Sequence, residues 1–108
     1  MNNSLVPETA IQLKPSFIRK GIHFKQISRT PVLAFYELST PNDGIFSFEV
    51  FKIEITPERI IKGFELPANE HYPNDEDFGR IAWSYGKLKG AKEKAIAKYN
   101  SLIVNYNV

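Results

Sequence analysis

The sequence predicts an α+β fold, in which a curved antiparallel sheet of about four strands carries one C-terminal helix packed on one face. Residues 24–55 are rich in aromatic and β-branched side chains and are divided by proline and glycine turns, a pattern typical of neighbouring strands. Residues 87–103 instead repeat apolar side chains at helical spacing. At 108 residues with 43% hydrophobic side chains, the chain is long enough to bury one modest core.

The N-terminal segment is polar and contains two prolines. We interpret residues 1–20 as an N-terminal arm, partly extended, and residues 21–104 as a single α+β domain. Residues 105–108 are expected to form a frayed tail. The arm contains too few apolar side chains to build a core of its own.

Two strands are expected after the arm. The first covers residues 24–29 and ends at Thr30-Pro31, because proline cannot donate a ladder hydrogen bond. The second covers residues 32–38. The segment that follows, residues 39–44, is composed of turn-forming residues, so the second and third strands are expected to form an antiparallel hairpin.

The third strand, residues 45–55, has apolar side chains on both faces. One face carries Phe46, Phe48 and Val50, whereas Phe51 and the isoleucines after it fall on the other. Either a bulge near Val50-Phe51 switches the phase, or both faces are covered; we favour the bulge. If no helix lies above Phe46 and Phe48, that face needs a partner or a second copy of the chain.

The segment from residue 56 to 66 is compatible with two structures. Thr56-Pro57-Glu58 resembles a helix start and Gly63 a helix stop, but only about two turns would fit, so extended structure is favoured. Residues 67–73 are expected to form a loop, and residues 74–79 one capped helical turn.

A strand at residues 80–85 and the helix complete the domain. The helix, expected at residues 87–103, has one apolar stripe, and Gly90 within it is expected to cost about 1 kcal/mol relative to alanine. The stripe comprises Leu88, Ala91, Ala95, Tyr99 and Leu102.

Composition excludes several function classes. The chain has no cysteine, which excludes disulfides, thiol catalysis and cysteine-ligated metals. His23 and His71 do not lie at metal-binding spacing, and no nucleophile elbow or phosphate-binding loop is present. We therefore expect no enzyme activity and no cofactor or metal. No run approaches the roughly 20 apolar residues of a spanning helix, so we expect no membrane partner and a cytoplasmic location.

A protein partner is the leading expectation, either a host protein or a second copy in a homo-oligomer. Two aromatic residues of the third strand are candidates because their face needs cover. The acids of the turn suit the start of a helix or, alternatively, a basic partner surface, and His71 beside Tyr72 is a candidate surface binding residue. The candidate interface residues are Phe46, Phe48, His71, Tyr72, Asp75 and Glu76.

Nucleic acid is the second candidate partner. Each phosphate neutralised by lysine or arginine adds affinity through counterion release. The formal net charge is only +2, and Glu37 and Glu49 lie on strands that would have to face the ligand. The candidate contacts are Lys14, Arg19, Lys20, Lys25, Arg29, Lys87, Lys94 and Lys98.

Parts of the chain resemble small phage-encoded accessory proteins of unknown function. The resemblance is carried by the segment from Tyr72 to Trp83, by Leu88 and Ala91, and by two earlier strand motifs, Tyr36-Glu37-Leu38 and Glu49-Val50-Phe51-Lys52-Ile53. It implies accessory phage or mobile-element biology, in which case the location would be the host cell cytoplasm.

Overall fold

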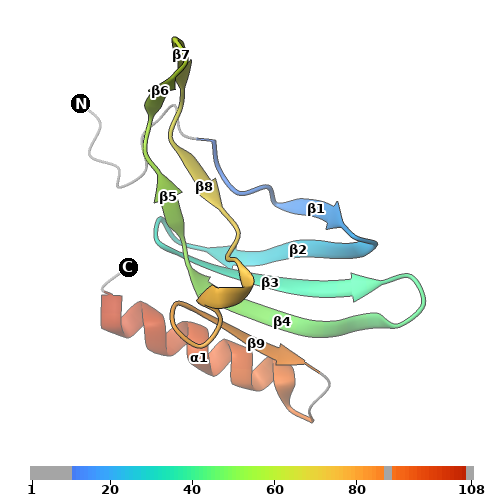
Figure 1. Ribbon diagram of the computed structural model, residues 1–108. Coiled ribbons are helices and arrows are strands. Elements are labelled where there is room, and N and C mark those ends of the chain that lie inside the picture. The colour runs from blue at the N-terminus through green and yellow to red at the C-terminus, as the bar shows by residue number, and fades with distance from the viewer. Residues whose placement is uncertain (1–10, 87–88, 107–108) are drawn as a thin grey trace.

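The main element of the structure is a five-stranded antiparallel sheet with strand order β1-β2-β3-β4-β9 (Figure 1). The computed structural model describes residues 11–86 and 89–106. One helix, α1 (Ala91–Tyr106), lies along one face of the sheet. The predicted α+β class, an antiparallel sheet with a C-terminal helix, is confirmed. The strands are β1 (Ser16–Arg19), β2 (Ile22–Arg29), β3 (Leu33–Thr40), β4 (Gly44–Lys52) and β9 (Ala82–Gly86).

The sheet has one more strand than the four expected, and the additional strand is β1. This strand lies within residues 1–20, the segment that we interpreted as an N-terminal arm. Residues 1–10 of that segment lie outside the described residues. Lys20 and Gly21, both with positive φ (52° and 79°), form a two-residue turn between β1 and β2. The expected curvature of the sheet stays a prediction.

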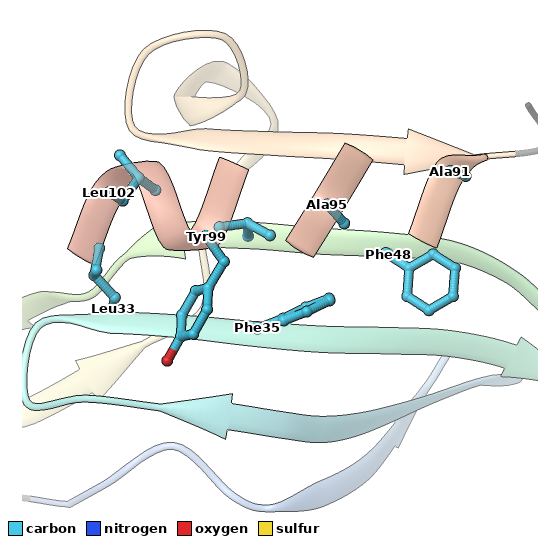
Figure 2. Packing of buried hydrophobic residues seen from close by; sticks show 8 residues of the cluster. Leu33, Phe35, Phe48, Ala91, Ala95, Tyr99 and Leu102 are labelled. Atoms are coloured by element: carbon cyan, nitrogen blue, oxygen red, sulfur yellow. The ribbon is translucent and has the colours of Figure 1, made fainter. Parts of the chain in front are cut away.

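The helix packs on β3, β4 and β9 through the apolar stripe that its sequence predicts (Figure 2). Gly90 has φ of 78° and precedes the helix, so the expected cost of a glycine inside the helix is wrong. Leu88 and Lys87 lie outside the described residues, as do residues 107–108 of the predicted tail. The buried contacts join Leu33, Phe35, Phe48 and Val50 of the sheet to Ala91, Ala95, Tyr99 and Leu102 of the helix.

The opposite face of the sheet holds a second apolar cluster. Val50 and Phe51 are both fully buried and point to opposite faces, and their register with β3 is continuous. The bulge favoured at this point is therefore wrong, and the alternative, cover on both faces, is correct. The register instead shifts where Leu38 pairs with Ser47 and Ser39 with Ile45. The second cluster consists of Phe24, Ala34, Tyr36, Leu38, Phe51, Tyr72 and Ala82.

Residues 54–71 form a hairpin arm that stands away from the sheet (Figure 1). At its base β5 (Glu54–Thr56) pairs with β8 (Asn69–His71), and at its end β6 (Arg59–Ile61) pairs with β7 (Phe64–Leu66). The preference for extended structure after residue 56 is confirmed, whereas the loop expected at residues 67–73 is wrong where β8 forms. We call residues 58–66 the arm tip, and the sheet with α1 and η1 the body.

A short 3-10 helix, η1 (Asp75–Asp77), connects the arm to β9 and confirms the predicted capped turn. The Asp77 carboxylate accepts a hydrogen bond from the Asn74 backbone N–H at 2.9 Å, and this bond lowers the Asp77 pKa. Gly79, at φ of 91°, lets the chain turn into β9.

Candidate protein interface

The hairpin arm is divided by a pair of prolines. Pro57 and Pro67 follow β5 and β7, and because proline has no backbone N–H, neither can continue the ladder. Thr56 opposite Asn69 is the last pair of the base, and Arg59 opposite Leu66 is the first pair of the tip. The arm is therefore two short ribbons in series.

The base of the arm is fixed to the body by a buried ion pair. Glu70 of β8, whose side chain is fully buried, accepts two hydrogen bonds from the Arg29 guanidinium, at 2.7 and 2.9 Å. The Leu13 backbone N–H donates a third, at 2.9 Å. Burial raises the pKa of Glu70, but these hydrogen bonds outweigh burial and place the pKa below its ordinary value. The ion pair joins three segments that are distant in the sequence.

Aromatic packing holds the arm where it returns to the sheet. Tyr72, the residue after β8, contacts the rings of Phe51 and Tyr36 at centroid distances of 4.7 and 5.2 Å. Its hydroxyl donates to Glu49 Oε1 at 2.6 Å. Burial, and then the Glu49 charge, raise the pKa of Tyr72, and burial also raises the pKa of Glu49. Tyr72, a candidate interface residue, is thus part of the core.

The arm tip exposes large apolar side chains. Ile60 is 70% exposed, Phe64 is 72% exposed and Ile61 is 46% exposed. Ile61 and Phe64 lie opposite each other and share a face, whereas Ile60 lies opposite Glu65 on the other face. An open groove of about 660 Å³ follows the tip, lined by Glu58, Arg59, Ile60, Glu65, Leu66 and Pro67. The tip therefore presents an apolar surface bordered by charges of both signs.

A two-residue turn closes the tip. Lys62 and Gly63 have φ of 51° and 81°, the conformation of the turn that best matches the twist of a hairpin. The sequence contained a signal for this turn, because Lys-Gly stands at both two-residue turns, Lys62-Gly63 and Lys20-Gly21, and glycine readily adopts positive φ. Extended structure was favoured here, but Gly63 was considered only as a helix stop, so the hairpin and the exposed residues of its tip were missed.

The other candidate interface residues lie apart from one another. Phe48 is 8% exposed beneath α1, so the sheet face expected to need a partner is covered by the helix of the same chain. Phe46 is half-buried and packs with the cluster on the other face. His71 is half-buried in β8, opposite Glu54. Asp75 and Glu76 are exposed in η1.

The structure separates the candidate nucleic-acid contacts into two groups. Lys14, Arg19, Lys20 and Lys25 are exposed along the β1–β2 edge of the body. The helical lysines lie beyond β3, because α1 covers β3, β4 and β9. They are Lys94, which is exposed, and Lys98, whose Nζ is 4.0 Å from the centroid of the Trp83 ring; Lys87 lies outside the described residues.

Arg29 is occupied within the body. The hydrogen bonds that the Arg29 guanidinium donates to Glu70 raise the Arg29 pKa, and both terminal nitrogens of the guanidinium bind that carboxylate. Arg29 therefore has a structural role, and Glu70 engages the guanidinium that was expected to contact phosphate.

Within residues 11–86 and 89–106, no group of three or more histidine, aspartate or glutamate side chains could hold a metal ion. No helix in the described part of the chain has the length and apolar character needed to cross a bilayer. Comparisons with protein-family models, with curated proteins and with solved structures find no match to this chain.

Proposed function

We propose that this chain is a non-enzymatic interaction protein that binds another protein through its arm tip. The observation that carries the proposal is the exposure of Ile60 and Phe64, at 70% and 72%, at the end of an arm whose base is fixed to the body. Large apolar side chains left exposed at the end of an anchored element are typical of protein interaction sites.

Folding of the body gives no reason for these side chains. Strands β6 and β7 contact each other and make no extensive contact with any other described element. An isolated two-stranded ribbon is at best marginally stable in water. A surface that covers the tip would remove Ile60, Ile61 and Phe64 from water and stabilise the ribbon at the same time.

Charge favours protein over nucleic acid as the partner. The arm carries Glu54, Glu58, Glu65 and Glu70 but only Arg59 and Lys62 as basic residues, a net charge of −2 with His71 neutral. Glu70 is paired with Arg29 and the arm tip has no net charge, so the arm lacks the surplus of basic side chains by which proteins bind a phosphate backbone. The resemblance to phage accessory proteins supports a host protein or the chain itself as partner, and the absence of cysteine suits action in the cytoplasm, that of the host cell if the chain is phage-encoded.

Photo-crosslinking tests this proposal. A photoreactive phenylalanine analogue replaces Phe64 in one sample and Val104, a 75% exposed residue of α1, in the matched control. We expect a protein adduct from position 64 and none from position 104, in extract of the cells that produce the chain. Excess unlabelled wild-type chain should suppress an adduct with a different protein, or should itself be cross-linked if the partner is a second copy, whereas excess Ile60→Ser chain should do neither. Equal adducts from the two positions, or suppression by both competitors, would contradict the proposal.

Nucleic-acid binding is the second candidate, supported by the exposed Arg19, Lys20 and Lys25 of the β1–β2 edge. A gel shift with duplex DNA and with single-stranded RNA, repeated over a salt series, separates it from the first. Phosphate contacts predict steep salt dependence that weakens in Lys20→Gln and Lys25→Gln variants. We expect no specific shift.

A further inference from the structure

The outer edge of β6 is unpaired within the described part of the chain. Strand β6 pairs only with β7, and the Lys62-Gly63 turn brings Ile61 opposite Phe64. In a two-residue hairpin the pair beside the turn is hydrogen-bonded, so the next pair directs its N–H and C=O groups outward. That pair is Ile60 and Glu65. Ile60 therefore offers one donor and one acceptor at the centre of the free edge.

The charges along this edge are arranged symmetrically about Ile60. Glu58 lies two residues before Ile60, and Lys62 lies two residues after it. If Ile60 pairs with Ile60 of a second, antiparallel copy, Glu58 of each copy comes near Lys62, the first turn residue, of the other copy. Opposite charges at facing positions stabilise a strand pair, and like charges destabilise it.

Strand β7 lacks this complementarity. Its central residue is Glu65, so a symmetric pairing of two β7 edges would place one glutamate opposite another. The arm tip as a whole contains Glu58, Glu65, Arg59 and Lys62 and has no net charge, so two tips do not repel each other. The edge that suits a second copy is therefore β6.

We infer that the arm tip binds a second copy of this chain, with the two β6 strands paired antiparallel about a two-fold axis through Ile60. This inference rests on the proposed function and names its partner. The pairing forms a four-stranded sheet in the order β7-β6-β6-β7. On one face the two Ile60 side chains meet, and on the other the Ile61 and Phe64 side chains of both copies form one apolar surface. Because the contact is confined to the tips, the dimer is weak and concentration-dependent.

Sedimentation equilibrium of the full chain tests this geometry. We expect a monomer–dimer equilibrium in the wild type, with Glu58→Lys or Lys62→Glu alone weakening dimerisation by about tenfold, since each places like charges near each other twice. The double variant E58K/K62E restores both pairs and should dimerise like the wild type, and so should an equimolar mixture of the two single variants. Glu54→Lys on β5, the same charge reversal outside the tip, is the matched control and should leave dimerisation unchanged. Circular dichroism checks that each variant is folded.

The outcomes separate this inference from the proposed function. The wild-type chain could stay monomeric at millimolar concentration while position 64 still yields an adduct with a different protein. That result would refute the second copy as partner and would leave the proposed function intact. A dimer that ignores the charge reversals overturns the pairing through β6. A monomer without any adduct from position 64 contradicts both.

Discussion

The body and the hairpin arm contain the same types of apolar residue in opposite environments, buried in the body and exposed in the arm. In the body, Phe51 is fully buried and packs against the rings of Tyr36 and Tyr72, at centroid distances of 5.8 and 4.7 Å. In the arm, Phe64 is 72% exposed and touches no apolar cluster of the body. Burial explains the phenylalanine of the body, but it does not explain that of the arm. Burial therefore does not account for the apolar side chains of the tip, and this difference is the basis on which we propose that they serve recognition.

The two phenylalanines give the largest expected contrast. Phe51→Ala should lower the free energy of unfolding by about 3–5 kcal/mol, because it removes a buried ring from a packed cluster. Phe64→Ala should change it by less than about 0.5 kcal/mol, the usual effect of a surface substitution. Urea unfolding followed by tryptophan fluorescence measures both. Similar losses in the two variants would show that the tip is part of the core.

The two glutamates of β7 and β8 give the next contrast. Glu70→Gln should cost about 2–3 kcal/mol at neutral pH, since it leaves Arg29 without its charge partner, whereas Glu65→Gln on the exposed tip should cost almost nothing.

The same ion pair predicts a pH dependence. The pKa of folded Glu70 lies below its ordinary value of 4.5, so the unfolded state binds the proton more readily. The stability contributed by Glu70 is therefore complete above that value and is lost as pH falls through the folded pKa. Urea unfolding at neutral pH and below about pH 4 should show the difference between wild type and Glu70→Gln shrinking in acid. A constant difference would contradict the ion pair.

Two similar turns, one in the body and one in the arm, allow the same comparison with a smaller expected change in stability. Gly21 in the body and Gly63 in the arm have φ of 79° and 81°, where alanine costs about 1–2 kcal/mol. Gly21→Ala should lower the global free energy of unfolding by about 1 kcal/mol, because β1 and β2 belong to the sheet. Gly63→Ala should leave that value unchanged and speed amide exchange only at residues 59–66. Equal global losses would argue against an independent arm.

The smallest effect is expected on the surface of the body. Lys98→Ala should cost about 0.5–1 kcal/mol, because the ammonium lies 4.0 Å from the centroid of the Trp83 ring. Lys94→Ala, an exposed position on the same helix, is the control. Thermal unfolding of both variants would resolve the difference, and identical midpoints would show that the contact with Trp83 is not stabilising.

Local patterns predicted the body well. The stripe of Ala91, Ala95, Tyr99 and Leu102 was visible from periodicity alone, because a helix buries one face at a fixed spacing. The apolar residues on both faces of β4 indicated that both faces of the strand could be buried, but no local feature distinguished this arrangement from a bulge.

Long-range pairing is what the sequence did not show. Arg29 and Glu70 are 41 residues apart, so nothing near Arg29 indicated that it is tied to a carboxylate and unavailable to phosphate. The arm was missed for a different reason, since Lys-Gly is a weaker turn signal than Asn-Gly and the β6 and β7 strands are only three residues each. The exposure of Ile60 and Phe64 could be recognised only from the structure, which shows that the hairpin stands away from the sheet.

Shortening the arm tests the division between body and arm most directly. In this variant a Gly-Ser linker replaces residues 58–67, which removes the tip, requires no ladder hydrogen bond from Pro57 and keeps the Thr56–Asn69 pair and the Glu70 ion pair. We expect its free energy of unfolding in urea to stay within about 1 kcal/mol of the wild type, because the tip contributes no burial to the body. A loss above about 3 kcal/mol would show that the tip is needed for folding, and would contradict its assignment to recognition.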